Sequence, residues 1–283
     1  MSVSIREALR EAARGLEHAG IADARREAGS LLSHVLAKDR TFLISHTNDE
    51  LRDVDLRAFE EMVARRASGE PAQYITGVQD FYGRSFRVTP DVLIPRPETE
   101  LLVDSALQVM DADARVCDVG TGSGCIAVTL LCERADARAV AVDISEAALR
   151  VALQNALALS VETRIVLRVS DCFAGLDPNA DQFDLILSNP PYVSAAALPG
   201  LQREVRDHEP LVALSPGADG LSVIRRLLLE APAFIKNRGH LLFEIGFDQG
   251  EAVRELVNRD VWTLCEILPD LQSIPRIVLL QKK

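Results

Sequence analysis

One short segment, Asn189-Pro190-Pro191-Tyr192, combines hydrogen-bond acceptors with a flat aromatic face directly after an apolar run at 183–188. Proline has no backbone N–H and a fixed φ, so the two prolines must end the buried strand that the apolar run predicts. The Asn189 side-chain oxygen and the Pro190 carbonyl can each accept one hydrogen of an –NH2 group, while the Tyr192 ring packs on its plane. The segment therefore suits a planar amide or amino nitrogen, although a plain surface turn would use the same residue types.

A glycine loop, Gly120-Thr121-Gly122-Ser123-Gly124, lies between an expected strand at 115–119 and an expected helix. Its glycines allow the backbone to turn sharply and to lie close to a ligand. The Gly-x-Gly-x-Gly spacing differs from the dinucleotide-binding pattern, and no Gly-Lys-Ser/Thr follows as in a P-loop. The loop contains no cation and follows the carboxylate of Asp118. We therefore expect a ligand that carries an ammonium group and a carboxylate and lacks phosphate.

The ends of the next expected strands carry further polar residues. Asp143 ends the second strand, where a carboxylate can accept hydrogen bonds from ribose hydroxyls. Asp171 and Cys172 end the third strand, where an adenine would lie, and Asn189 ends the fourth. An amino acid, a ribose and an adenine together describe S-adenosyl-L-methionine as the cofactor and S-adenosyl-L-homocysteine as its product.

The composition limits the class of protein. The chain has 283 residues, is 48% hydrophobic and carries a net charge of −11, which disfavours a broad nucleic-acid footprint. No apolar run is long enough for a membrane span, and the N-terminus lacks a signal peptide's hydrophobic segment, so we expect a cytoplasmic protein. The five cysteines are scattered without a Cys-x-x-Cys pair, which indicates reduced thiols and no metal site.

The elements that must position these residues fall into three regions. Ser4 and Asp23 as capping residues, and Asp53 or Asp55 as the start of a third helix, predict three short amphipathic helices and hence a helical domain over residues 1–75. A hairpin linker is expected over 76–95, with extended segments at 73–77 and 81–88. Strands and helices then alternate over 96–283, which predicts an α/β domain with a doubly wound, mostly parallel sheet.

The last part of that domain needs a different arrangement. No room for a helix remains between the expected strands 263–268 and 276–281, so they should pair as an antiparallel end of the sheet. A long helix is expected at 221–236, before the strand at 240–245.

Several segments together resemble a known family. The glycine loop and the Asn-Pro-Pro-Tyr segment are similar to those of class I methyltransferases that act on planar nitrogens. The segments 71–77, 94–100 (Ile-Pro-Arg-Pro-Glu-Thr-Glu) and 209–214 narrow the match to the HemK/PrmC family, which methylates a glutamine side-chain nitrogen in class I peptide chain release factors. The resemblance covers nearly the whole chain, and it implies a cytoplasmic protein that is expected to be a monomer and to contact release factors without direct nucleic-acid binding.

The resemblance also assigns positions. For the cofactor these are Asp118, Gly120, Thr121, Gly122, Ser123, Gly124, Asp143, Asp171, Cys172 and Asn189. For the substrate glutamine they are Leu93, Ile94, Asn189, Pro190, Pro191 and Tyr192, of which Asn189, Pro190 and Tyr192 would take part in catalysis. Two departures stand out: Cys172 replaces an aromatic residue found in some relatives, and the turn at 270–276 lacks an expected glycine.

Two alternatives remain open at this point. The first is a nucleic-acid methyltransferase acting on adenine N6 or guanine N2, because the same motif suits those amines. Flipping a base needs a positively charged groove. The chain has 31 Lys and Arg residues but 42 Asp and Glu residues, which argues against a nucleic-acid substrate. The second is a cofactor-binding regulatory protein without turnover, which a damaged motif would favour; both motifs are intact here.

Overall fold

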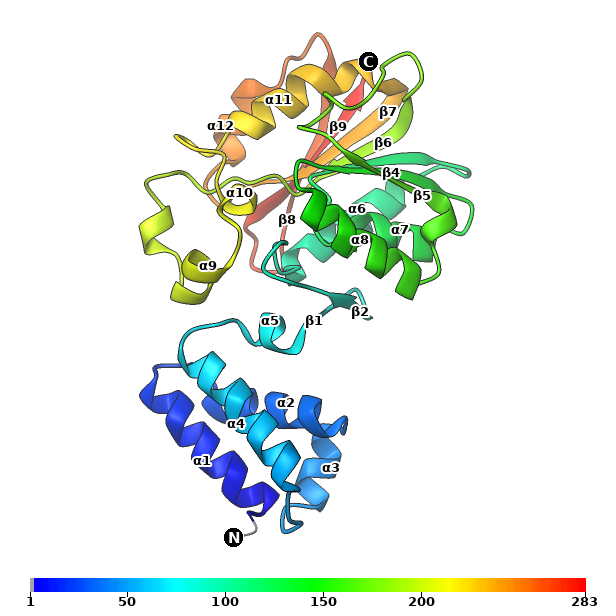
Figure 1. Ribbon diagram of the computed structural model, residues 1–283. Coiled ribbons are helices and arrows are strands. Elements are labelled where there is room, and N and C mark those ends of the chain that lie inside the picture. Colours follow the sequence, from blue (N-terminus) through cyan, green and yellow to red (C-terminus); the bar gives the residue numbers. More distant parts are fainter. Residues whose placement is uncertain (1–2) are drawn as a thin grey trace. The chain divides into compact units, whose positions relative to one another are not determined.

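The computed structural model describes residues 3–283 and contains two compact units (Figure 1). The first runs to Val78 and also includes Gln202–His208; the second comprises Gln79–Leu201 and Glu209–Lys283. The short segment 202–208, which lies far along the chain, was not expected in the first unit.

The first unit is helical. Its core contains the apolar faces of α1 and α2 together with Leu43, Phe59 and Ile75. The Ser4 capping box is confirmed, since Ser4 Oγ accepts from the Glu7 N–H and Glu7 Oε2 accepts from the Ser4 N–H. Asp23 is the N-cap residue of the second helix, as predicted, but it adopts a left-handed conformation and makes no side-chain capping bond. The helices are α1 (Ile5–His18), α2 (Ala24–Leu36), α3 (Arg40–Ser45), α4 (Asp53–Ala67), α5 (Ala72–Thr76) and α9 (Arg203–His208).

The segment 73–77 is not extended as predicted, because most of it forms α5. Gly77 ends this helix at φ +75°, and Thr76 Oγ1 donates back to the Ala72 carbonyl at 3.0 Å. Tyr74 and Ile75 are both buried, whereas adjacent side chains of an extended segment would point in opposite directions, and the helical turn thus lets one side of the segment pack. The hairpin that follows pairs β1 (Val78–Phe81) with β2 (Arg84–Arg87).

The second unit contains the predicted α/β sheet. Seven strands lie in the order β5-β4-β3-β6-β7-β9-β8, and all neighbours are parallel except β7/β9 and β9/β8. The predicted antiparallel end is thus confirmed. The strands are β3 (Arg115–Val119), β4 (Arg138–Asp143), β5 (Ile165–Val169), β6 (Phe183–Ser188), β7 (Ile235–Glu244), β8 (Trp262–Pro269) and β9 (Pro275–Lys282).

Helices cover both faces of this sheet (Figure 1). Successive strand residues alternate between two cores: Val116 packs in the core that includes α6 and α7, whereas Cys117 packs in the core that includes α11 and α12. Burial on both faces explains the nearly continuous apolar strands. The helices of this unit are η1 (Pro97–Thr99), α6 (Glu100–Val109), α7 (Cys125–Glu133), α8 (Glu146–Ala158), η2 (Glu162–Arg164), η3 (Leu198–Gly200), α10 (Leu211–Leu214), α11 (Ser222–Glu230), η4 (Ala231–Ala233) and α12 (Gly250–Leu256).

Two details differ from expectation in the last part of the chain. The helix predicted over 221–236 ends at Glu230, because Pro232 allows only a 3-10 turn before β7 begins at Ile235. The turn at 270–276 closes without glycine: Ser273 adopts φ +64°, and Asp270 Oδ1 accepts from the Gln272 and Ile274 N–H groups at 2.8 and 3.0 Å.

Candidate functional site

The glycine loop and the Asn-Pro-Pro-Tyr segment follow adjacent strands. Asp118 of β3 pairs with Leu187 of β6, so Gly120 and Asn189 follow two residues beyond this pair on each strand. From β3 the chain moves to β4 and β5 on one side and then returns to β6 on the other. Such a reversal opens a crevice at the carboxyl ends of the strands, where open α/β sheets bind ligands. The Ser188 hydroxyl ties the two ends together by donating to the Val119 carbonyl at 2.7 Å.

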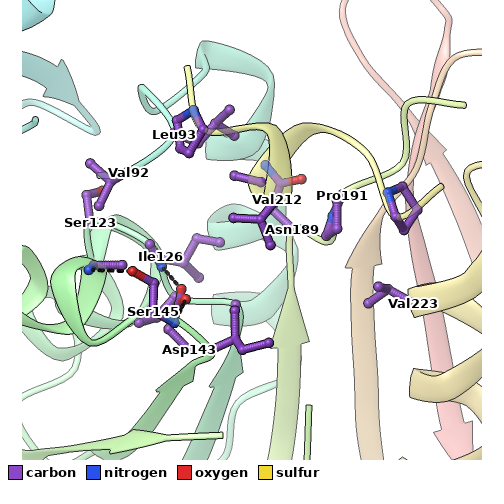
Figure 2. Close-up of a pocket in the computed structure, with 18 of the residues that line it drawn as sticks. Val92, Leu93, Ser123, Ile126, Asp143, Ser145, Asn189, Pro191, Val212 and Val223 are labelled. Atoms are coloured by element: carbon purple, nitrogen blue, oxygen red, sulfur yellow. Dashed lines mark hydrogen bonds between the residues drawn. The ribbon is translucent and has the colours of Figure 1, made fainter. Parts of the chain in front are cut away.

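A cavity of about 280 Å³ lies at this edge (Figure 2). Figure 2 shows Asp143 and Ser145 on one wall, with Asn189 and Pro191 across the cavity from them. Of the residues that the sequence predicted, these line the cavity: Leu93, Gly120, Thr121, Gly122, Ser123, Asp143, Asp171, Asn189 and Pro191. The others that were predicted, Ile94, Asp118, Gly124, Pro190, Cys172 and Tyr192, lie outside its lining.

The glycine loop is fixed to the end of β4. Its Gly120 and Thr121 N–H groups both donate to the Val142 carbonyl, at 2.9 and 3.0 Å. Gly122 has φ +55°, and a side chain there would meet no protein atom within 4 Å, which leaves that direction open. Gly124 is needed for packing instead, because a Cβ on it would lie 3.1 Å from that of Ala152 in α8.

Asp118 is fully buried beneath the loop. Its Oδ2 accepts from the Thr121 hydroxyl at 2.7 Å and from the Ala127 N–H at 3.3 Å, while Oδ1 has no hydrogen-bond partner among the described residues. Burial raises the pKa of Asp118 to about 6, against the opposing effect of these two hydrogen bonds. The carboxylate therefore supports the loop from within the core.

Asp143 holds the loop from the cavity side. Its Oδ2 accepts from the Gly122 N–H and its Oδ1 from the Ser145 N–H, both at 2.9 Å. Burial raises the pKa of Asp143, and the backbone N–H groups counteract this effect. Because each oxygen accepts only one of these hydrogen bonds, further acceptor capacity remains for ligand hydroxyls.

The wall after β5 contains a residue that the sequence did not point to. Arg226 of α11 lines the cavity and donates to Asp171 Oδ1 at 2.6 Å and to the Asp171 carbonyl at 3.1 Å. Cys172 points into the core with Phe173, so the structure does not place it beside Asp171 on the wall. The sequence could not indicate this role for Arg226, because α11 follows β6 along the chain and only the fold brings it to Asp171 at the end of β5.

Across the cavity from Asp171, hydrogen bonds of Glu209 hold two segments of the wall together. Glu209 is buried and accepts from Arg96 at 2.5 Å and from the Ile94 N–H at 3.3 Å. These contacts join the Pro-Arg-Pro-Glu segment to the segment that begins α10. Cavity-lining residues come from both segments: Val92, Leu93, Pro95, Arg96, Pro210, Val212 and Ala213. The sequences of both segments contributed to the family resemblance, but they did not indicate that the two segments contact each other.

The Asn-Pro-Pro-Tyr segment is held by side chains from three elements. Asn189 Nδ2 donates to Thr99 Oγ1 at 3.0 Å, and the Tyr192 hydroxyl donates to Glu244 Oε1 at 3.0 Å. Gln249 Nε2 donates to the Tyr192 carbonyl at 3.0 Å. Burial and the Glu244 carboxylate raise the pKa of Tyr192, so the tyrosine remains neutral. The segment is therefore held in place by the protein's own side chains.

Within residues 3–283, no group of three or more His, Cys, Asp or Glu side chains is placed to hold a metal ion. Over the same residues, no helix combines the length and the apolar character that crossing a membrane requires.

Two family models match this chain. Residues 7–77 match the family model described as the PrmC N-terminal domain, and residues 97–203 match the methyltransferase small domain. The fold agrees, since the chain is similar to a methyltransferase from Pyrococcus furiosus with a TM-score of 0.53 at 15% identity, over 79% of this chain and 98% of that one. The second unit thus has the fold of a methyltransferase domain.

Full-length relatives narrow the class to one family. The chain is 47% identical over 272 residues to the release factor glutamine methyltransferase of Cereibacter sphaeroides, with 96% of each chain covered. It is 43% identical over 282 residues to the protein of that name from Koribacter versatilis, with 99% of each covered. The chain belongs to the release factor glutamine methyltransferase family, which confirms the resemblance seen in the sequence.

Proposed function

We propose that this protein transfers a methyl group from S-adenosyl-L-methionine to the side-chain amide nitrogen of a glutamine in a peptide chain release factor. The observation that carries this proposal is the position of Asn189, an amide fixed by Thr99 at the edge of a cavity bounded by the glycine loop and Asp143. The full-length relatives support the substrate class by their names.

The residues around the loop fit the cofactor. The backbone at Gly122 is open toward the cavity, and Asp143 retains acceptor capacity that suits a ribose. Ser123 lines the cavity, and its Oγ is buried without a hydrogen-bond partner among residues 3–283, so this hydroxyl is available to a ligand. Asp171, already paired with Arg226, would border the adenine. S-adenosyl-L-methionine, when bound, supplies an electrophilic methyl group.

The protein's own contribution is positioning. An amide nitrogen is a weak nucleophile because its lone pair is delocalised into the carbonyl. Asn189 Oδ1 and the Pro190 carbonyl would each accept one N–H of the substrate amide, which directs the nitrogen and stabilises the positive charge that grows on it. Pro191, on the cavity wall, and the rigidly held Tyr192 would limit the orientations of the side chain. This arrangement needs no basic residue to deprotonate the nitrogen beforehand.

The helical unit would dock the release factor. None of the motifs described above lies in α1 to α4, yet α9, which packs in this unit, belongs to the chain segment between the Asn-Pro-Pro-Tyr motif and α10. Arg66 anchors α9 within the unit through ion pairs with Glu27 at 3.0 Å and Glu204 at 2.6 Å. The chain that leaves the substrate-gripping motif therefore runs through the proposed docking unit.

Substitution of Asn189 tests the proposal. Asn189→Ala removes an acceptor that acts during attack, so kcat should fall on the order of 10²–10³-fold, with little change in the S-adenosyl-L-methionine affinity measured by calorimetry. Asn189→Asp keeps an acceptor but adds charge beside the sulfonium, so its rate should lie between those of Ala and Asn. Asn179→Ala, at an exposed asparagine outside the cavity lining, is the control.

The assay is single-turnover transfer to a release factor, with mass spectrometry to locate the methyl group. A wild-type rate in Asn189→Ala would contradict the role of this residue. Methyl groups on nucleic acid instead of glutamine would contradict the proposed function.

A further inference from the structure

A buried chain of hydrogen bonds lies behind the substrate amide site. Asn189 Nδ2 donates to Thr99 Oγ1 at 3.0 Å, Thr99 Oγ1 donates to Glu244 Oε2 at 2.7 Å, and Glu244 Oε1 accepts from the Tyr192 hydroxyl at 3.0 Å. Thr99 comes from η1, Glu244 from the end of β7, and the other two from the segment after β6. These hydrogen bonds thus join three parts of the methyltransferase domain.

The direction of these hydrogen bonds follows from the number of donors. A carboxylate only accepts, so the single hydroxyl hydrogen of Thr99 must point to Glu244. The Thr99 oxygen can then act only as an acceptor toward Asn189, which must present its NH2 group to it. The Asn189 oxygen is consequently turned away from Thr99. Thr99 is 2% exposed and Glu244 is 1% exposed, so water cannot replace either partner.

The burial of Glu244 calls for an explanation beyond stability. Among residues 3–283 no cation forms a direct ion pair with Glu244: Arg276 is near enough to lower its pKa but pairs with Asp270 at 3.0 Å. Burying a charge without a direct partner is unfavourable. Burial raises the pKa of Glu244, while the hydrogen bonds from Thr99 and Tyr192 lower it. A buried, unpaired carboxylate beside a ligand cavity is a frequent mark of function.

We propose that Thr99 and Glu244 are positioning residues that fix the Asn189 amide with its oxygen toward the substrate nitrogen. This inference rests on the proposed function. If the amide were flipped, its NH2 group would face the substrate NH2 group, donor against donor. The fixed orientation also favours glutamine over glutamate, because the Asn189 oxygen attracts an N–H group and repels a carboxylate. The second oxygen of Glu244 fixes Tyr192 in the same way.

Three variants of Thr99 and Glu244 test this role. Thr99→Val keeps the shape and removes the hydroxyl, so Asn189 loses its orientation and kcat should fall about tenfold, as expected for one lost hydrogen bond. Thr99→Ser restores the hydroxyl and should recover the wild-type rate to within about threefold. The glutamine side chain in Glu244→Gln can donate as well as accept, so it no longer fixes the direction of the hydrogen bonds through Thr99. This variant should lower kcat to a similar extent as Thr99→Val. The S-adenosyl-L-methionine affinity should be unchanged in all three.

A double-mutant cycle separates positioning from a merely structural role. In the Asn189→Ala background there is no amide to orient, so adding Thr99→Val should cause no further loss of kcat. Losses that multiply in the double variant, or a loss of cofactor affinity in Thr99→Val, would overturn the inference. If Thr99→Val does not fold, the same cycle with Glu244→Gln decides the question.

The activity of the wild-type protein distinguishes a failure of the proposed function from a failure of the proposed role of Thr99 and Glu244. If the wild type leaves the release factor glutamine unmethylated, the proposed function fails. If the wild type methylates it and the Thr99 and Glu244 variants are equally fast, only this inference fails.

Discussion

Gly220→Ala should slow methyl transfer although it changes no residue of the Asn-Pro-Pro-Tyr motif. Gly220 has φ +76°, and a Cβ built on it would lie 2.2 Å from the Tyr192 carbonyl oxygen and 2.9 Å from Gln249 Nε2. Because the first contact is with backbone, the chain at Tyr192 must move by roughly 1 Å to reach ordinary contact distance. Gly77 offers a matched control, since it has φ +75° and a Cβ there would meet nothing within 4 Å.

The expected magnitudes follow from this comparison. Both substitutions force alanine into a left-handed conformation, which costs about 1–2 kcal/mol of unfolding free energy. Gly220→Ala adds overpacking, which costs about 1–3 kcal/mol more. The displaced Tyr192 carbonyl shifts the preceding Asn-Pro-Pro, and a misplacement of about 1 Å can reduce the rate about 10²-fold. Gly77→Ala should therefore lose some stability and keep its rate, whereas Gly220→Ala should lose both.

The measurements are chemical denaturation of both variants and single-turnover methyl transfer at saturating cofactor, below the unfolding transition. Equal losses of stability in the two variants would refute the close-contact argument. A wild-type rate in Gly220→Ala would refute the claim that this contact positions the motif.

Three other predictions concern the cofactor, the pH dependence and the docking unit. Gly122→Val should greatly reduce the S-adenosyl-L-methionine affinity measured by calorimetry and leave the fold intact, because Gly122 lines the cavity and a side chain there would meet no protein atom but would occupy space beside the ligand. Unchanged affinity would mean that this loop does not bind the cofactor. The pKa of Asp118 is raised to about 6 from 3.8, so its favourable contribution to folding is present below pH 4 and is lost as the pH rises to about 6. Asp118→Asn should therefore gain on the order of 3 kcal/mol of unfolding free energy relative to wild type between pH 4 and pH 7.5, and a pH-independent difference would contradict the buried carboxylate. An intact release factor should show a higher kcat/KM than a short peptide with the same glutamine, and equal values would argue against docking by the helical unit.

Local sequence was sufficient for the strands of the large sheet and for the two motifs. The apolar run before Asn189 predicted β6 with its bounds, since a buried parallel strand is apolar throughout and prolines end it. The loop after β3 was identified by its three glycines, which adopt positive φ values at less steric cost than other residues. Where local signals were weak, the prediction failed, as at 73–77, where burial of two adjacent side chains produced α5.

The partners of these motifs were decided by the tertiary structure alone. Nothing in the sequence links Thr99 to Glu244, or Gly220 to Tyr192, because each pair meets only after the strand order has brought distant segments to one edge of the sheet. For the same reason Asp118, which the sequence placed beside the ligand, was found beneath the loop. Residue type and spacing encode what a side chain can do, whereas its donors, acceptors and burial depend on non-local packing.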